Sequence, residues 1–196
     1  MKNYLLAFMV VVCASCNTGN NSTKENVSHP IEENEERVYF PVTTYIMGQV
    51  SDINERGVSP IKINSHDGKS DTTFIKLSDF KNEIKDFIEP TIDSSFIVKY
   101  FSEKKFLDQT LNEVTIMYEP KNILPDSLQW LSWNVYINPE TKKVDKIYLN
   151  KRVSKECTKQ LIWKSALKSC SIVTIMEDTQ TKNATIKNEQ LIKWDY

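Results

Sequence analysis

Few side chains in this sequence have the types and spacing that catalysis requires. Histidine occurs only twice, and His66 stands beside Asp67 with several serines close by. A serine, a histidine and a carboxylate can form a hydrolytic site, but the sequence lacks the G-x-S-x-G motif that often positions such a serine. The pattern predicts a solvated turn at His66 and no catalytic residue, and it leaves a small hydrolase as the alternative.

Metal and cofactor chemistry have equally little support in the sequence. The run from Asn64 to Asp71 is rich in oxygen donors, but it lacks the glutamate and the spacing of a calcium loop. After Cys16 the chain contains no C-x-x-C motif, and it has neither an H-E-x-x-H motif nor a glycine-rich phosphate loop. We therefore expect no metal and no cofactor.

Basic residues are concentrated in one region, which could bind an anion. Residues 141–170 contain nine lysines or arginines but only two acidic residues, Asp145 and Glu156. The candidate anion-binding residues are Lys159, Lys164 and Lys168, and the partner would be an anionic lipid or an acidic glycan. Nearby tryptophans would then stack on sugars or lie at a lipid interface. The alternative is that the lysines are solvated strand residues and the tryptophans belong to the core.

The overall charge balance points away from nucleic acid. The 196-residue chain carries 25 lysines and arginines against 26 aspartates and glutamates, a formal net charge of −1. A nucleic-acid-binding domain usually has a strongly basic surface. We expect no nucleic-acid partner.

Cys157 and Cys170 are the two cysteines outside the N-terminal region. An oxidising compartment would permit a disulfide between them. The expected turn near Ser165 to Ser169 would not place them directly opposite each other. A disulfide and two separate thiols therefore both remain open.

The N-terminal residues could undergo a different chemistry, acylation of a thiol. The apolar run Leu5 to Val12 follows Lys2 and is much shorter than the roughly 20 residues of a membrane-spanning helix. A charged start, a short apolar core and small residues before a cleavage point are typical of a secretory signal. The stretch Val12-Cys13-Ala14-Ser15-Cys16 resembles a bacterial lipobox, with Cys13 departing from the usual leucine, valine or isoleucine. The alternative is an ordinary secretory signal.

This resemblance implies a small envelope lipoprotein of the Bacteroidota type and divides the chain into three parts. Residues 1–15 would be the signal peptide, 16–36 the lipidated Cys16 with a disordered tether, and 37–196 a single domain. The tether is expected to be disordered because it is polar and has no aromatic residue. The resemblance implies anchoring to a membrane by lipid, with the outer membrane facing the periplasm favoured over the cell surface.

Hydrophobic periodicity predicts an α+β fold for the domain. Helical spacing is found over 41–56, over 78–89, and from a cap at Asp93 through Phe101. In the third segment, the run Phe96-Ile97-Val98 could equally form a strand. Asp67-Gly68 predicts a hairpin that places Ile61 opposite Phe74 and Ile63 opposite Thr72.

After Glu113 the hydrophobic period changes to two, which predicts a curved antiparallel meander of about six strands. Both faces of this sheet would carry apolar residues, so helices or a small molecule are expected to cover the second face. Such sheets are similar to half-barrel folds of the lipoprotein-carrier kind. We expect a non-enzymatic module that binds a ligand or partner on the sheet, with a hydrolase and a purely structural or interaction protein as alternatives.

Overall fold

The computed structural model describes residues 38–66 and 68–194, and these belong to one compact unit. The predicted signal peptide, the lipidated Cys16 and the tether lie outside the described residues, as does Asp67. None of the described helices is both long enough and apolar enough to cross a membrane.

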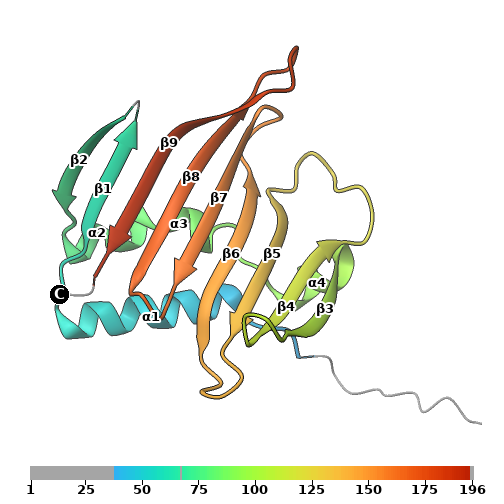
Figure 1. Ribbon diagram of the computed structural model, residues 1–196, viewed down its shortest axis with the longest axis horizontal. Helices are drawn as coiled ribbons and strands as arrows, with labels where there is room; N and C mark the ends of the chain where they lie inside the picture. The colour runs from blue at the N-terminus through green and yellow to red at the C-terminus, as the bar shows by residue number, and fades with distance from the viewer. Residues whose placement is uncertain (1–37, 67, 195–196) are drawn as a thin grey trace, which may run out of the picture. The chain divides into compact units, whose positions relative to one another are not determined.

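A single open antiparallel sheet of nine strands dominates the fold (Figure 1). Its order is β2-β1-β9-β8-β7-β6-β5-β4-β3, so β3 to β9 form a meander and the N-terminal hairpin extends it beside β9. The strands are β1 Ile61–His66, β2 Lys69–Phe74, β3 Phe101–Asp108, β4 Glu113–Pro120, β5 Trp130–Ile137, β6 Val144–Arg152, β7 Cys157–Lys164, β8 Ser169–Glu177 and β9 Ala184–Lys193. The α+β class is confirmed, but the expectation of about six strands was too low.

The meander strand that the sequence did not reveal is β3. The predicted helix reaches only Tyr100, and the chain enters β3 at Phe101, which is buried. From Lys104 to Leu107 the strand is exposed, and Glu103, Lys104 and Lys105 are charged. Charged side chains protect an edge strand against pairing with other chains, and they also hide its hydrophobic alternation.

Among the described residues, four helices precede the meander: α1 Val42–Arg56, α2 Leu77–Glu83, α3 Lys85–Ile88 and α4 Ser94–Tyr100. Gly57 ends α1 in the left-handed region at φ 68°, and the Asp93 side chain caps α4 by accepting from the Phe96 N–H at 2.8 Å. The single helix predicted over 78–89 is divided at Ile84. This break lets both short helices contribute buried residues.

The helices cover one face of the sheet and enclose an aromatic core (Figure 1). Trp130, Trp133 and Trp163 are all fully buried, and Trp133 stacks on Tyr118 with 4.8 Å between ring centroids. These three tryptophans are therefore core residues and cannot stack on an external sugar.

No described helix covers the opposite face of the sheet, so the expectation of helices there is not met among the described residues, and a covering small molecule stays a prediction. Its central side chains, including Tyr136, Tyr148 and Ile162, are half-buried by their cross-strand neighbours. The Tyr148 hydroxyl donates a hydrogen bond to the side chain of Asn150 at 3.0 Å. Both side chains belong to the polar part of this face.

Candidate functional site

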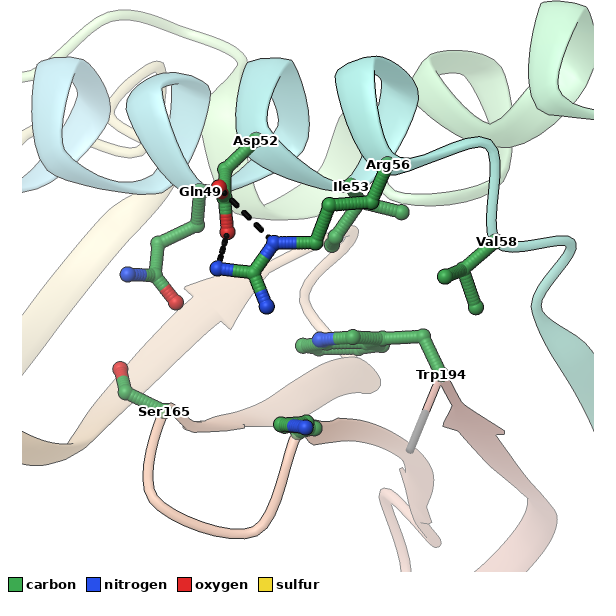
Figure 2. A pocket seen from close by; sticks show the side chains of 8 residues that line it. Gln49, Asp52, Ile53, Arg56, Val58, Ser165 and Trp194 are labelled. Carbon is green, nitrogen blue, oxygen red and sulfur yellow. Dashed lines mark hydrogen bonds and ion pairs between the residues drawn. The ribbon is translucent and has the colours of Figure 1, made fainter. Parts of the chain in front are cut away.

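Two adjoining hollows run between α1 and the turns at one end of the sheet, with volumes of about 790 and 290 Å³. We call them together the α1 groove, since Gln49 and Ser165 line both. Figure 2 shows the smaller hollow, with Gln49, Asp52 and Arg56 projecting from α1 opposite Ser165 and Trp194. The remaining lining residues are Phe40, Tyr45, Ile53, Val58, Asn138, Thr141, Lys142, Lys143, Val144, Asp145, Ala166 and Lys168.

Helical spacing on α1 separates the core from the groove. Val42, Ile46, Val50 and Ile53 are buried against the sheet. A neighbouring stripe is formed by residues three or four positions apart, which lie on one side of a helix: Tyr45, Gln49, Asp52 and Arg56. The same periodicity that builds the core therefore also points four polar or aromatic side chains into the groove.

The turn between β5 and β6 forms one wall of the larger hollow. The Asn138 side chain accepts from the backbone N–H groups of Glu140 and Thr141 at 3.0 and 2.9 Å. Lys142 then adopts a positive φ of 58°. The turn is therefore fixed by its own hydrogen bonds and presents two consecutive lysines, Lys142 and Lys143, to the groove.

The turn between β7 and β8 is tied to its surroundings. Ser165 accepts a hydrogen bond from the Tyr45 hydroxyl at 3.0 Å, which joins this turn to α1. The backbone N–H of Trp194 donates to the Lys168 carbonyl at 3.0 Å, and the backbone N–H of Ala166 donates to the Asp145 carbonyl at 3.4 Å. These contacts hold the base of the groove together.

Positive charge in the groove exceeds negative charge. Arg56 forms an ion pair with Asp52 at 2.8 Å, so these two lining charges offset each other. Lys142, Lys143 and Lys168 make no ion pair with any carboxylate between residues 38 and 194, leaving out Asp67. Asp145 is the remaining acidic residue in the lining. The groove can therefore attract an anion.

The three lysines predicted as an anion site do not share one surface. Lys159 lies on the helix-covered face, where its ammonium contacts the Asp86 carboxylate. Lys164 lies on the uncovered face, directly opposite Lys146 of β6. Only Lys168 lines the α1 groove. The alternation of side chains along β7 separates Lys159 from Lys164.

Asp86 of α3 joins two lysines of the basic region in what we call the Asp86 cluster. Its carboxylate contacts Lys151 at 3.0 Å and Lys159 through the other oxygen. Lys151 is 7% exposed, and its ammonium also donates to the Glu89 carbonyl at 2.6 Å. Burial alone would raise the pKa of the Asp86 carboxyl, but the two ammonium groups hold its pKa below the usual value. The arrangement fastens α3 to the sheet.

His66 is not part of a catalytic arrangement among the described residues. Its Nδ1 lies 2.6 Å from the carbonyl oxygen of Lys187, near the tip of the hairpin. Ser65 is adjacent in the strand and therefore points to the opposite face, where its hydroxyl contacts that of Ser70. Residues 38–66 and 68–194 also contain no group of histidine, cysteine and acidic side chains able to hold a metal ion.

Cys157 and Cys170 are free thiols in the structure. Both lie on the β7–β8 pair, but Cys157 is opposite Met176 whereas Cys170 is opposite Trp163. They therefore lie at opposite ends of this strand pair, too far apart in register to be bonded. The structure thus corresponds to the alternative of two separate thiols. Burial raises the pKa of the Cys170 thiol, and Cys157 is only partly buried.

Sequence reasoning missed most of the α1 groove. One available signal was Gln49, a polar residue at helical spacing from Tyr45, Ile46 and Ile53. Another signal was the similarity of NPETKK at 138–143 to DTQTKN at 178–183. Both turns place a lysine at positive φ, Lys142 at 58° and Lys182 at 59°. The turn geometry was therefore readable, but the position of one turn beside α1 was not.

Comparison of the chain with models of protein families, with curated proteins and with solved structures finds no match.

Proposed function

We propose that this protein is a non-enzymatic binding module of the cell envelope that holds a small ligand in the α1 groove. The groove itself is the observation that carries the proposal. Its larger hollow, about 790 Å³, has the size of a typical ligand site. Two aromatic side chains, Phe40 and Tyr45, line it together with seven polar or charged residues that can hydrogen-bond a ligand.

The composition of the lining favours binding over catalysis. Two candidate nucleophile hydroxyls line the groove: that of Ser165 accepts a hydrogen bond from Tyr45, and that of Thr141 accepts from the Lys143 backbone N–H. The lining contains no histidine that could activate either one. Of the lining carboxylates, Asp52 lines the smaller hollow and Asp145 the larger one, and Asp52 is held by Arg56. The hydrolase alternative therefore has no constellation to support it in the groove.

Anchoring belongs to the same proposal and rests on the lipobox resemblance at Cys16. Two or three acyl chains on one residue hold a protein firmly on a bilayer. We propose a periplasm-facing location on the outer membrane. Wild type should fractionate with membranes and yield an acylated N-terminal Cys16 peptide by mass spectrometry, whereas Cys16→Ala should not. A mature wild-type N-terminus without lipid would reject the anchor and leave the groove proposal standing.

The groove is tested by identifying what it holds. Wild type, Gln49→Trp and Asn54→Trp are purified from the native envelope, and bound small molecules are identified by native mass spectrometry. Gln49 lines both hollows, so a tryptophan there fills the groove, whereas Asn54 is exposed on the same helix outside it. The proposal expects a recurrent compound with wild type and Asn54→Trp that is missing from Gln49→Trp.

A protein-interaction role is the second candidate, because no described helix covers the second face of the sheet. It would be preferred if wild type carried no small molecule and instead retained a protein through side chains of that face. Tyr136→Ala and Tyr148→Ala would then release the protein, and Gln49→Trp would keep it.

A further inference from the structure

We infer that the ligand class of the α1 groove is a linear acidic oligosaccharide, a short sugar chain that carries carboxylates. This inference rests on the proposed function, because it names the ligand of the same groove. It is built from the charge of the lining, the neutral polar groups along it and the geometry of its two turns.

The cationic groups come from two different turns, one bordering each hollow. Lys142 and Lys143 line the larger hollow, and Lys168 lines the smaller one. Among the described residues these ammonium groups have no carboxylate partner, so they remain available to an external anion. A ligand that meets both sets must be elongated and must bear negative charge in more than one place.

Between the lysines the groove offers hydrogen bonds and aromatic surface. The side-chain amide of Gln49 makes no hydrogen bond within the described part of the chain, so it can serve a ligand. Phe40 and Tyr45 lie side by side with 5.5 Å between ring centroids and border the larger hollow. Amides, hydroxyls and aromatic faces together suit the hydroxyl groups and the apolar faces of sugar rings.

An anionic lipid surface fits the same end of the molecule less well. A flat bilayer would also meet acidic residues that do not line the groove: Asp108 at the end of β3, Glu113 at the start of β4 and Glu140 in the turn between β5 and β6. Glu113 already forms an ion pair with Lys146 at 3.2 Å. Positive charge exceeds negative charge inside the groove. A narrow sugar chain can enter the groove, whereas a flat bilayer cannot.

The test measures trigalacturonate binding by calorimetry, with the chain of residues 16–196 carrying Cys16→Ala. Maltotriose is the neutral sugar control, hexaglutamate is the acidic peptide control, and vesicles with phosphatidylglycerol supply anionic lipid. Trigalacturonate should bind more tightly than each of the other three. Its affinity should fall steeply from about 0.01 M to about 0.15 M ionic strength, as the Debye length shortens from about 30 to about 8 Å.

The matched variants are Lys142→Gln with Lys168→Gln, and Lys182→Gln with Lys155→Gln. Lys142 and Lys182 occupy the same position in turns of the same geometry, so the two doubles remove equal charge from opposite ends of the sheet. The groove double should weaken trigalacturonate binding by at least about tenfold, because two charge-assisted contacts are lost. The control double should change it by less than about twofold.

Several results would overturn the inference. They are no trigalacturonate binding, equal binding of maltotriose or hexaglutamate, tighter binding to the vesicles, or equal weakening by both double variants. Recovery of a native groove ligand without an acidic group would also overturn it, and in that case the proposed binding function would stand.

Discussion

The Asp86 cluster and the α1 groove draw their lysines from the same basic region but use them in opposite ways. Lys151 and Lys159 share the Asp86 carboxylate beneath α3, and Lys151 is nearly excluded from water. Lys142 and Lys168 stand on exposed turns, with no carboxylate partner in the described chain. The difference teaches that a run of lysines in sequence does not define a site. A buried lysine with a partner stabilises the fold, and an exposed lysine without one is available for binding.

The largest expected effect comes from removing the carboxylate of the Asp86 cluster. Asp86→Ala should lower the free energy of unfolding by about 3 kcal/mol, because the Lys151 ammonium would stay buried without its counter-charge. Urea denaturation measures this change.

Asp126→Ala is the matched control for that experiment. Asp126 also faces two basic groups, Arg152 at 3.6 Å and Lys155 at 3.9 Å, but its side chain is 78% exposed. Its loss should change the free energy of unfolding by less than about 0.5 kcal/mol. Equal losses in the two variants would contradict the contrast between buried and exposed charge.

The two lysines of the cluster should differ from each other. Lys151→Met leaves the Glu89 carbonyl without its lysine donor and should cost about 2 kcal/mol. Lys159→Met removes a partly exposed contact and should cost about 1 kcal/mol. Thermal unfolding of both variants shows which one loses more stability. A larger loss of stability for Lys159→Met would mean that the burial of Lys151 does not determine which lysine matters more.

The cluster also predicts a pH dependence. The pKa of Asp86 is lower in the folded chain than its unfolded value of about 3.9. Its stabilisation is therefore complete above the unfolded pKa and is lost as the pH falls through the folded pKa. Between about pH 5 and about pH 2, wild type should lose more unfolding free energy than Asp86→Asn. Parallel pH curves for the two proteins would be inconsistent with this linkage.

The smallest expected change in stability comes from two lysines that occupy the same position in similar turns. Comparing them separates an effect on stability from an effect on binding. Lysine at positive φ is strained, so Lys142→Gly and Lys182→Gly should each raise the free energy of unfolding by about 0.5 kcal/mol. Trigalacturonate affinity should fall for Lys142→Gly and stay unchanged for Lys182→Gly. Stability is measured by urea denaturation and affinity by calorimetry. A loss of affinity in both variants would show that the groove position of Lys142 is irrelevant.

Local features of the fold were predictable from sequence because their signals are local. Asp67-Gly68 set the hairpin register, and the structure pairs Ile61 with Phe74 and Ile63 with Thr72 as expected. Asp93 caps α4 as its position suggested. The hairpin joins the sheet beside β9, at the far end of the chain, and no local pattern announces such a pairing.

The groove escaped prediction because it depends on which turns come together around α1. Lys142 and Lys168 belong to different turns, and both border the groove only because β5 to β8 are consecutive in the sheet. Lys159 and Lys164 belong to one strand, but their sequence separation places them on opposite faces. Assigning each lysine to a face or a turn needed the register of every strand.

Lysine acetylation of the native chain, read by peptide mass spectrometry, tests the contrast between the two regions most directly. Lys151 and Lys159 should remain unmodified while Lys142, Lys143 and Lys168 react. Trigalacturonate should slow the reaction at those three groove residues and leave Lys155 and Lys182 unaffected. Rapid acetylation of Lys151, or equal protection of Lys155 and Lys182 by the sugar, would contradict the division of the basic region into a folding cluster and a binding groove.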